Sequence, residues 1–245
     1  MCALAVSFMI GSSNSFSIRQ DARSICESVA LDRFISIPSG VPVTVDGKVS
    51  PKEWDDAESI EISADLDWKI PVRFKHDEKN LYFQFTRARN GKNRLFPELF
   101  FDSTNKKSHD WEKGNWWFHV SANLRESDGE PNVYEKNGVF QCAHKKQGWE
   151  ANNPPETDTI EIRIALDKIG IETVSGARIS FAAGVTNATG DEKQTWHIWP
   201  AKSRVESPST WGVAILKYFG YRAGGEREKE VTAPNNAETY LQRLA

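Results

Sequence analysis

The feature that most limits how this chain can fold is an alternation of apolar and polar residues that recurs in short segments. Ile160, Ile162 and Ile164 alternate with charged residues, and residues 72–85 show the same period of two on either side of a polar turn at 77–80. Side chains two positions apart lie on the same face of a β-strand, whereas an amphipathic helix repeats every 3.6 residues. The pattern therefore predicts half-buried strands, with a hairpin over 72–85.

Three further segments carry the same alternation and are separated by polar turns: residues 98–104, 115–124 and 178–188. Short strands joined in this way are typical of two antiparallel sheets packed face to face. The sequence therefore predicts an all-β protein, an antiparallel β-sandwich of the jelly-roll or immunoglobulin-like kind. A turn or single helical turn is expected at 167–176, and the polar stretch 124–157 is expected to form loops around a short strand near 139–143.

The two ends of the chain differ from this central region. Residues 1–20 join an apolar stretch to small polar residues, which is typical of a secretory signal peptide and also fits a disordered N-terminus. Residues 21–40 are expected to form an extension with a short helix over 21–37, and residues 219–245 a charged tail with a short C-terminal helix. The sandwich domain is predicted over 41–218.

Composition narrows the class of partner. Lys and Arg total 31 against 34 Asp and Glu, a net charge of −3, so the chain lacks the positive field that holds a nucleic-acid backbone. No segment reaches the roughly 20 apolar residues of a membrane span. The chain has nine tryptophans, more than an ordinary core needs, and Trp is a side chain often used at ligand surfaces. This surplus fits an aromatic binding surface, and composition alone does not distinguish such a surface from tryptophans that fill the core.

Motifs for metal, nucleophilic or phosphate chemistry are absent from the sequence. There is no His-Glu-x-x-His, Gly-x-Ser-x-Gly or phosphate loop, and the three cysteines fit no metal-ligand spacing. In an exported chain that has lost Cys2, Cys26 and Cys142 either form a disulfide or remain two free thiols.

Seven motifs follow one another in an order that resembles a known family. "VDGKVSPKEW" (45–54) opens the series and "SPSTWGVAIL" (207–216) closes it. Between them come "VRFKHDEKNLYFQF" (72–85), "PELFFDSTNKK" (97–107), "GNWWFHVSAN" (114–123), "TIEIRIALDKIGI" (159–171) and "ISFAAGVTNA" (179–188). Together they resemble the family 9 carbohydrate-binding modules and their DOMON-like relatives, over residues 41–218.

The resemblance implies a non-catalytic glycan-binding module, secreted or periplasmic, that is associated with polysaccharide degradation. Members of the family clamp a terminal sugar between two tryptophans. The corresponding positions here, within 90–96 and at Val205, hold no tryptophan, and His119 stands where the family has an arginine. Other residues must therefore form any sugar site in this chain.

A sugar site needs aromatic faces for the C–H groups of a pyranose and polar side chains for its hydroxyls. Trp117 and His119 share one face of their predicted strand, and the flanking loops supply aromatic and basic residues. Trp196 and Trp199 face opposite sides of a strand, and Trp199 is favoured as the platform. The candidate carbohydrate-binding residues are Trp199, Trp111, Trp149, His119, Trp117, Arg94 and Arg204.

The resemblance also implies a structural calcium ion. Asp102, Asn105 and Asp110 supply oxygen donors in one loop, and Ca²⁺ takes such ligands. Unpaired carboxylates in a loop can equally be solvated.

Other residues are expected to be structural. Asp46 and Gly47 are expected to form a tight turn with positive φ at glycine. Trp54 is expected to be buried on the apolar face that holds Ile60 and Ile62, and Trp211 to pack at the start of the last strand.

Three other functions remain open. The first is a protein-interaction sandwich that has lost its sugar site. The second is a glycosidase, although Glu98 and Asp102 lie roughly 13 Å apart on one strand face, beyond the separation that either mechanism uses; Glu161 lies on another strand. The third is a haem-binding module, which would need two histidine ligands because both methionines lie in the first ten residues.

Overall fold

The structure is a computed structural model. It describes residues 32–65, 68–86, 93–123, 131–137, 140–143, 148–154, 157–172, 174, 176–189 and 195–217. The chain divides into two compact units, Met1–Phe34 and Ile35–Ala245, and the sandwich belongs to the second.

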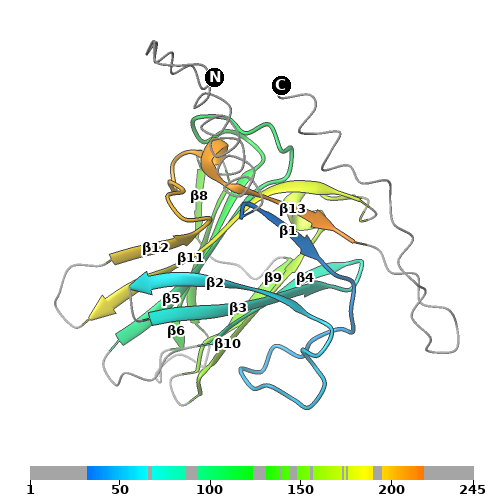
Figure 1. The fold of residues 1–245 in the computed structure, drawn as a ribbon, viewed down its shortest axis with the longest axis vertical. Helices are drawn as coiled ribbons and strands as arrows, with labels where there is room; N and C mark the ends of the chain where they lie inside the picture. Colours follow the sequence, from blue (N-terminus) through cyan, green and yellow to red (C-terminus); the bar gives the residue numbers. More distant parts are fainter. Residues whose placement is uncertain are drawn as a thin grey trace, which may run out of the picture. The chain divides into compact units, whose positions relative to one another are not determined.

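Two sheets form the second unit (Figure 1). Sheet A has eight strands in the order β1-β13-β11-β5-β6-β7-β8, with β12 also paired to β11, and sheet B has five in the order β2-β3-β4-β10-β9. The strands of sheet A are β1 Phe34–Ile37, β5 Asn93–Asp102, β6 Asn115–Asn123, β7 Pro131–Asn137, β8 Phe140–Ala143, β11 Arg178–Thr189, β12 Thr195–Trp199 and β13 Gly212–Leu216. Those of sheet B are β2 Glu58–Asp65, β3 Trp68–His76, β4 Asn80–Thr86, β9 Trp149–Asn152 and β10 Thr159–Ala165. All neighbouring strands other than β1 and β13 are shown to pair antiparallel, which confirms the predicted sandwich.

The period of two in the sequence becomes the inner face of each sheet. Ile162 of β10 and Phe83 of β4 lie in one buried cluster with Phe101 of β5 and Phe181 of β11. The ring centroid of Phe83 lies 6.0 Å from that of Phe101 and 5.6 Å from that of Phe181. Burying a side chain of this size contributes about 1.5–3 kcal/mol. The core therefore lies between the sheets, and the hairpin predicted over 72–85 is confirmed as β3 and β4.

Residues 41–57, here called the strap, cover the part of the outer face of sheet B that holds Lys75, Tyr82 and Glu161. Trp54 is 4% exposed and packs against Val43 and Tyr82. Lys75 of β3 is fully buried; its ammonium donates to Asp56 at 2.7 Å and lies 5.5 Å from the centre of the Trp54 ring. Lys75 is therefore buried and paired under the strap instead of solvated.

Glu161 of β10 is the second anchor of the strap. Its Oε1 accepts a hydrogen bond from Trp54 Nε1 at 3.1 Å, and its Oε2 accepts from the backbone N–H groups of Asp46 and Gly47 at 3.1 and 2.9 Å. Gly47 has φ +74°, as predicted for this turn, and a Cβ there would lie 2.5 Å from Pro154 Cγ. Burial raises the pKa of Glu161 to about 7, outweighing the hydrogen bonds that favour its charged form.

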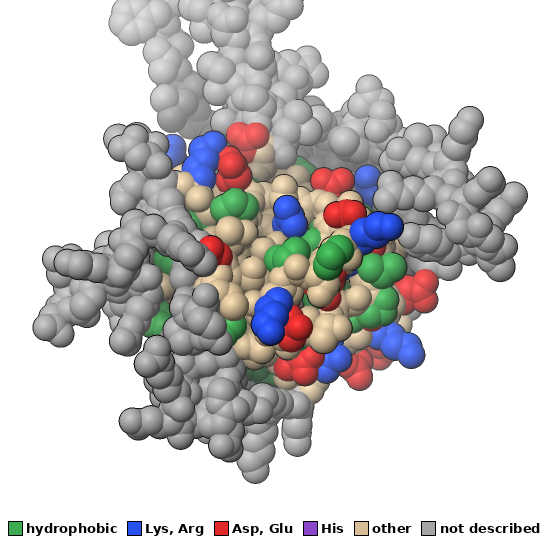
Figure 2. All heavy atoms as spheres, turned by 90° about the horizontal axis from the view of Figure 1, so that it is seen from below, with side chains coloured by type: hydrophobic (Ala, Val, Ile, Leu, Met, Phe, Trp, Pro, Cys, Tyr) green, Lys and Arg blue, Asp and Glu red, His purple; other side chains and the backbone are tan. Residues whose placement is uncertain are grey.

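Trp54 is buried, but on the opposite face of sheet B from the one predicted. Ile62 points into the core between the sheets, whereas Trp54 belongs to the separate cluster under the strap. The strap folds back across the sheet, a long-range contact that the local alternation does not reveal. Figure 2 shows one face of the molecule, on which basic and acidic side chains of described residues are interspersed.

Three strands lie in segments where the sequence predicted loops or a helix. β7 and β9 lie within 124–157, where only the short strand now seen as β8 was expected, and β1 occupies the end of the helix predicted over 21–37. These strands are short or polar and form by pairing with a neighbouring strand. The helical turn expected at 167–176 is confirmed as η1 Asp167–Ile169.

Several predictions concern residues outside the described ranges. They are the signal peptide at 1–20, the extension up to residue 31, the tail at 219–245, and Cys26 with the side chain of Cys142. No helix of the described residues is long and apolar enough to cross a membrane.

Candidate functional site

The outer face of sheet A carries a carboxyl group enclosed by three hydrogen-bonding side chains. Glu98 of β5 is fully buried. Its Oε2 accepts from Trp117 Nε1 at 2.6 Å, while its Oε1 accepts from Thr186 Oγ1 and lies against His119 Nδ1, each at 2.7 Å. These partners come from β6 and β11, the strands that flank β5. If one of these hydrogen bonds broke, a buried polar atom would be left with neither a partner nor water. The carboxyl group therefore holds the surrounding side chains in place.

β12 approaches β11 closely here because Gly184 has no side chain. A Cβ at Gly184 would lie 2.9 Å from the backbone carbonyl oxygen of His197. Gly184 pairs with Glu98 on one side and with Ile198 on the other, and Trp196 pairs with Thr186. The close approach brings β12, with its aromatic side chains, beside the enclosed carboxyl.

Trp196 and Trp117 are in contact on this outer face. Their ring centroids lie 5.9 Å apart, with the ring planes at 55°. Trp117 also stacks on Phe100, at 5.7 Å and 26°. Trp196 is 44% exposed, the only tryptophan among the described side chains that is classed as exposed. An accessible ring therefore rests against one that is held by a buried carboxyl.

A second group of aromatic side chains on the same face is structural. Trp211 is 1% exposed and packs against Phe100 at 5.7 Å and against Trp111 at 5.6 Å. The indole N–H groups of Trp211 and Trp111 donate to the carbonyl oxygens of Arg204 and Val205, each at 3.0 Å. These bonds hold the loop between β12 and β13 on the sheet. The structural role predicted for Trp211 is confirmed, and Trp111 lies half-buried beside it.

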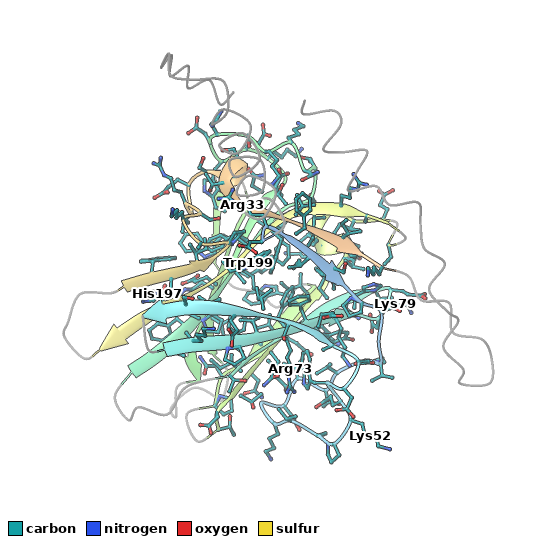
Figure 3. The ribbon with its side chains drawn as sticks, in the orientation of Figure 1. Arg33, Lys52, Arg73, Lys79, His197 and Trp199 are labelled. Carbon is teal, nitrogen blue, oxygen red and sulfur yellow. The ribbon has the colours of Figure 1, made fainter. Side chains whose placement is uncertain are left out.

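Two candidate carbohydrate-binding residues, Trp199 and Trp149, lie away from this face. Trp199 belongs to β12, like His197 (Figure 3), but packs against the main core with its ring 6.0 Å from Phe181. Trp149 is 3% exposed and packs on Phe118 at 5.1 Å. Trp196 and Trp199 do face opposite sides of their strand, as predicted, but the exposed one is Trp196. Of the two rings, Trp196 is therefore the one on the outer face.

The remaining predicted site residues occupy different places. Trp117 and His119 are together on the outer face, as their spacing predicted. Arg204 is exposed in the loop that covers Trp211, with its backbone N–H donating to Thr210 Oγ1 at 2.9 Å. Arg94 lies in β5 opposite Ala188, but its side chain is outside the described residues.

The loop predicted to hold calcium is closed by its own hydrogen bonds. Asp102 is fully buried; its Oδ1 accepts from the backbone N–H and hydroxyl of Thr104, and its Oδ2 from the backbone N–H of Lys107. Asn105 Oδ1 accepts from Ser180 Oγ at 2.8 Å. The third predicted ligand, Asp110, lies exposed.

The side-chain ammonium group of Lys107 already lies at this loop. The ammonium of Lys107 donates to the backbone carbonyl oxygens of Trp211 and Gly212, at 2.6 and 3.2 Å. The six to eight oxygen ligands that Ca²⁺ takes are not assembled around Asp102. Over the described part of the chain, no group of three or more His, Cys, Asp or Glu could hold a metal ion. The predicted residues therefore do not fit a calcium ion.

Sequence reasoning missed the centre of this site. It considered Glu98 only as one of a pair of glycosidase carboxylates and did not consider Thr186. Since Glu98 lies on the same strand face as Phe100, the polar residue could be placed on this sheet face from the sequence. Its partners come from two other strands whose register the sequence does not show.

The fold is therefore a two-sheet β-sandwich with an exposed tryptophan on the outer face of sheet A. The sequence model of the family described as "Carbohydrate family 9 binding domain-like" matches residues 45–218. This chain belongs to that family, as the motifs predicted.

Solved structures with the same fold include a family 9 carbohydrate-binding module from Caldicellulosiruptor kristjanssonii in complex with cellotriose. It is 18% identical, has a TM-score of 0.56, and the match covers 80% of this chain and 99% of that chain. A family 9 module from the same organism in complex with glucose is also 18% identical with a TM-score of 0.56, covering 78% and 99%. No curated protein matches this chain in sequence.

Proposed function

We propose that this chain binds glycans through the outer face of sheet A, with the exposed ring of Trp196 as the surface on which a sugar stacks. The observation that carries this proposal is the contact between Trp196 and Trp117, whose indole N–H is held by Glu98. A pyranose packs its C–H groups on an aromatic ring and turns its hydroxyls toward polar side chains. His119, held by the same carboxyl, is a polar side chain on the same face.

The rigidity of this face favours ligand binding. Trp117 is fixed by Phe100 and by Glu98, and the carboxyl is fixed by its other two partners. A ring that is ordered before the ligand arrives loses little conformational freedom when it binds. The face therefore provides stacking area at a low entropic cost.

Sugars with equatorial ring hydroxyls are the class to test first. Such sugars have flat faces of C–H groups, whereas an axial hydroxyl projects from one face and obstructs stacking. The similar solved structures hold cellotriose and glucose. We therefore propose β-linked glucose oligosaccharides as the leading ligand class.

The proposed role is non-catalytic. A glycosidase needs two accessible carboxyl groups about 5–9.5 Å apart, on either side of the sugar bond. Glu98 and Asp102 are both fully buried with donors on their oxygens, and Glu161 is enclosed under the strap of the other sheet. We further propose that the protein is exported and serves polysaccharide breakdown by holding the polymer.

The test is a titration of the purified protein by calorimetry and by intrinsic tryptophan fluorescence. The panel consists of glucose, cellohexaose, xylohexaose, mannohexaose and a β-1,4-galactan oligosaccharide. A saturable signal for one class, with a change in tryptophan emission, is the expected result. No binding across the panel by folded protein would contradict the proposal and favour a protein-contact surface. A haem absorption band in the purified protein would contradict it as well.

Trp196→Ala and Trp199→Ala form a matched pair, because both remove an indole from β12. Trp196→Ala should abolish binding and change the free energy of unfolding by less than about 1 kcal/mol, as expected for an exposed site. Trp199→Ala should lower stability while the folded fraction still binds. Loss of binding in Trp199→Ala but not in Trp196→Ala would contradict the proposal, because it would place the sugar on the opposite side of β12.

A further inference from the structure

His76, at the end of β3, is fully buried where three segments of the chain meet. Its Nε2 lies 2.8 Å from the backbone carbonyl oxygen of Lys217, just after β13, and its Nδ1 lies 3.2 Å from the backbone nitrogen of Glu78. The backbone N–H of Glu78 is a donor, so Nδ1 accepts and carries no proton. The proton of the neutral ring is therefore on Nε2, which donates to Lys217.

The backbone of His76 holds the segment that leads out of β1. Its N–H donates to the carbonyl oxygen of Pro38 at 2.9 Å, and its carbonyl oxygen accepts from the N–H of Gly40 at 2.8 Å. The N–H of Lys217 donates to the carbonyl oxygen of Ile37 at 2.9 Å. Residues 37–40 are therefore held from both sheets, by the end of β3 and the end of β13, and the His76 ring links those two ends.

A proton added to the His76 ring goes to Nδ1, where it opposes the backbone N–H of Glu78. Two donors then face each other at a buried site, and each loses its hydrogen bond. Moving the turn at Glu78 would relieve that conflict but leave the charged ring buried. The ring must therefore reach solvent, which breaks its hydrogen bond to Lys217.

The charges around His76 do not compensate for this burial. Burial lowers the pKa of His76 below 6.5, outweighing the Lys217 hydrogen bond and the carboxyl groups of Asp77 and Glu78, which favour the charged form. The other segments packed on His76 bring the charged residue Lys217 from β13 and no charge from residues 38–40 or from Leu81 of β4. The stabilisation by the neutral ring is therefore fully present above pH 6.5 and is lost as the pH falls below it.

Acid acts on the strap in the opposite sense. The pKa of Glu161 is raised by its burial, so its contribution to stability is fully present at low pH. Asp77, in the turn after β3, titrates lower still: despite its burial, hydrogen bonds from Tyr82 and the turn hold its pKa below 3.8. Between pH 6.5 and about pH 4, mild acid therefore weakens the His76 junction while the Glu161 anchor of the strap stays in place.

The segment held by His76 lies outside the conserved part of the sandwich. The family model matches residues 45–218, whereas β1 covers only Phe34–Ile37 and ends the strand order of sheet A (Figure 1). Ile37 is buried in the main core, so the segment stays bound while the His76 ring is neutral. Its release removes one terminal strand and leaves the matched strands paired.

We propose that His76 is an acid-sensitive switch: when its ring takes a proton, residues 34–40 separate from the ends of β3 and β13 while the strap stays anchored on sheet B. The switch controls how the segment before the family domain is attached. It involves neither the aromatic face of sheet A nor a glycan, so it is independent of the proposed function.

Hydrogen exchange of the 245-residue chain at pH 7.5 and pH 4.5, corrected for the intrinsic rate of each amide, tests the switch. The N–H groups of Gly40 and Lys217 report on the junction, and those of Asp46 and Gly47 report on the strap. The protection of Gly40 and Lys217 should fall at least about fivefold at the lower pH, because the open state binds the proton better. The protection of Asp46 and Gly47 should not fall.

Two histidine variants assign the effect to the ring of His76. His76→Gln keeps an N–H donor for the Lys217 carbonyl but does not titrate, so the protection of Gly40 should differ by less than about twofold between the two pH values. His109→Gln changes an exposed histidine in the loop after β5 and should behave like the wild type. An equal fall in His76→Gln, an equal fall in the strap, or constant protection of Gly40 in the wild type would overturn the proposal.

A direct titration of the His76 ring keeps the test decisive if His76→Gln does not fold. The ¹⁵N chemical shifts of the ring in the wild type should show Nδ1 unprotonated at pH 7.5. Nδ1 should then take a proton over the same pH range in which the protection of Gly40 falls. Protection that falls while the ring stays neutral, or a ring that is protonated with Gly40 still protected, would contradict the switch.

Discussion

Each outer face of the sandwich has a buried glutamate that accepts a hydrogen bond from a tryptophan, but the two pairs lie in different surroundings. On sheet B, buried Glu161 accepts from the indole of Trp54, and on sheet A, buried Glu98 accepts from the indole of Trp117. Trp54 is 4% exposed under the strap, whereas Trp117 lies half-buried beside a ring that is 44% exposed. The Glu161–Trp54 pair is enclosed under the strap, whereas the Glu98–Trp117 pair lies beside an exposed ring.

This difference shows that a buried carboxyl bonded to an indole does not by itself mark a site. What distinguishes sheet A is the accessible ring next to the fixed one. On sheet B, the strap supplies Val43 and Asp56 to complete the enclosure. The experiments that follow separate stability from binding on the two faces.

The largest effect is expected from removing the indole of the strap. Trp54→Ala should lower the free energy of unfolding by about 3–5 kcal/mol, because it leaves a cavity against Tyr82 and removes a donor from buried Glu161. Urea denaturation measures this loss. Trp196→Ala is the control, with a small loss of stability. Equal losses for the two variants would show that the two faces do not differ as described.

The pH dependence of stability tests the burial of Glu161 on sheet B. Its pKa rises from 4.5 in the unfolded chain to about 7 in the fold, because burial disfavours the charged form. The folded protein therefore binds a proton that the unfolded chain releases, so this contribution is fully present below pH 4.5 and is lost as the pH rises to 7. Linkage makes the loss on the order of 3 kcal/mol.

Comparing wild type with Glu161→Gln at pH 5 and pH 8 isolates this group. His76 acts in the opposite sense, because burial lowers its pKa below 6.5 and its contribution is lost as the pH falls. It is present in both proteins, so it cancels in the difference. A stability difference that is the same at both pH values would contradict the raised pKa.

A smaller effect on stability, but a direct one on binding, is expected at Glu98. Glu98→Gln replaces one acceptor oxygen with an N–H group that faces a donor, either Trp117 or the His119 and Thr186 pair. Stability should fall by about 1–3 kcal/mol, and glycan affinity should fall at least about tenfold because the indole loses its fixed orientation. Calorimetry and thermal unfolding measure both. Unchanged affinity would show that Glu98 supports the fold alone.

The smallest effect concerns the loop at Asp102. Lys107→Met removes the ammonium that binds two backbone carbonyl groups and should cost about 1–2 kcal/mol. EDTA or added calcium should leave the melting temperature of the wild type unchanged. A melting temperature that rises with calcium would contradict the reading of Lys107 as the loop's cation.

The fold was predictable where the signal is local. Ile160, Ile162 and Ile164 point into the core as their spacing required, and Gly47 adopts the positive φ that the turn predicted. The burial of Lys75 was not predictable, because its partner Asp56 lies 19 residues away in the sequence, in a segment that folds over it.

The site was predictable only in part, for the same reason. Spacing placed Trp117 with His119 and put Trp196 and Trp199 on opposite sides of a strand. Which of those two rings faces outward depends on the register between β12 and β11, a long-range property. The central role of Glu98 depends on three strands meeting, so it emerges only in the folded protein.

The most direct test of the central claim is to follow the indole N–H resonances of the ¹⁵N-labelled protein during titration with the glycan that binds best. Single Trp→Phe variants assign the nine tryptophans. The resonances of Trp117 and Trp196 should shift along a saturable curve while that of Trp54 stays in place. Saturable binding that shifts Trp54 and leaves Trp117 and Trp196 unmoved would contradict the claim that sheet A carries the site.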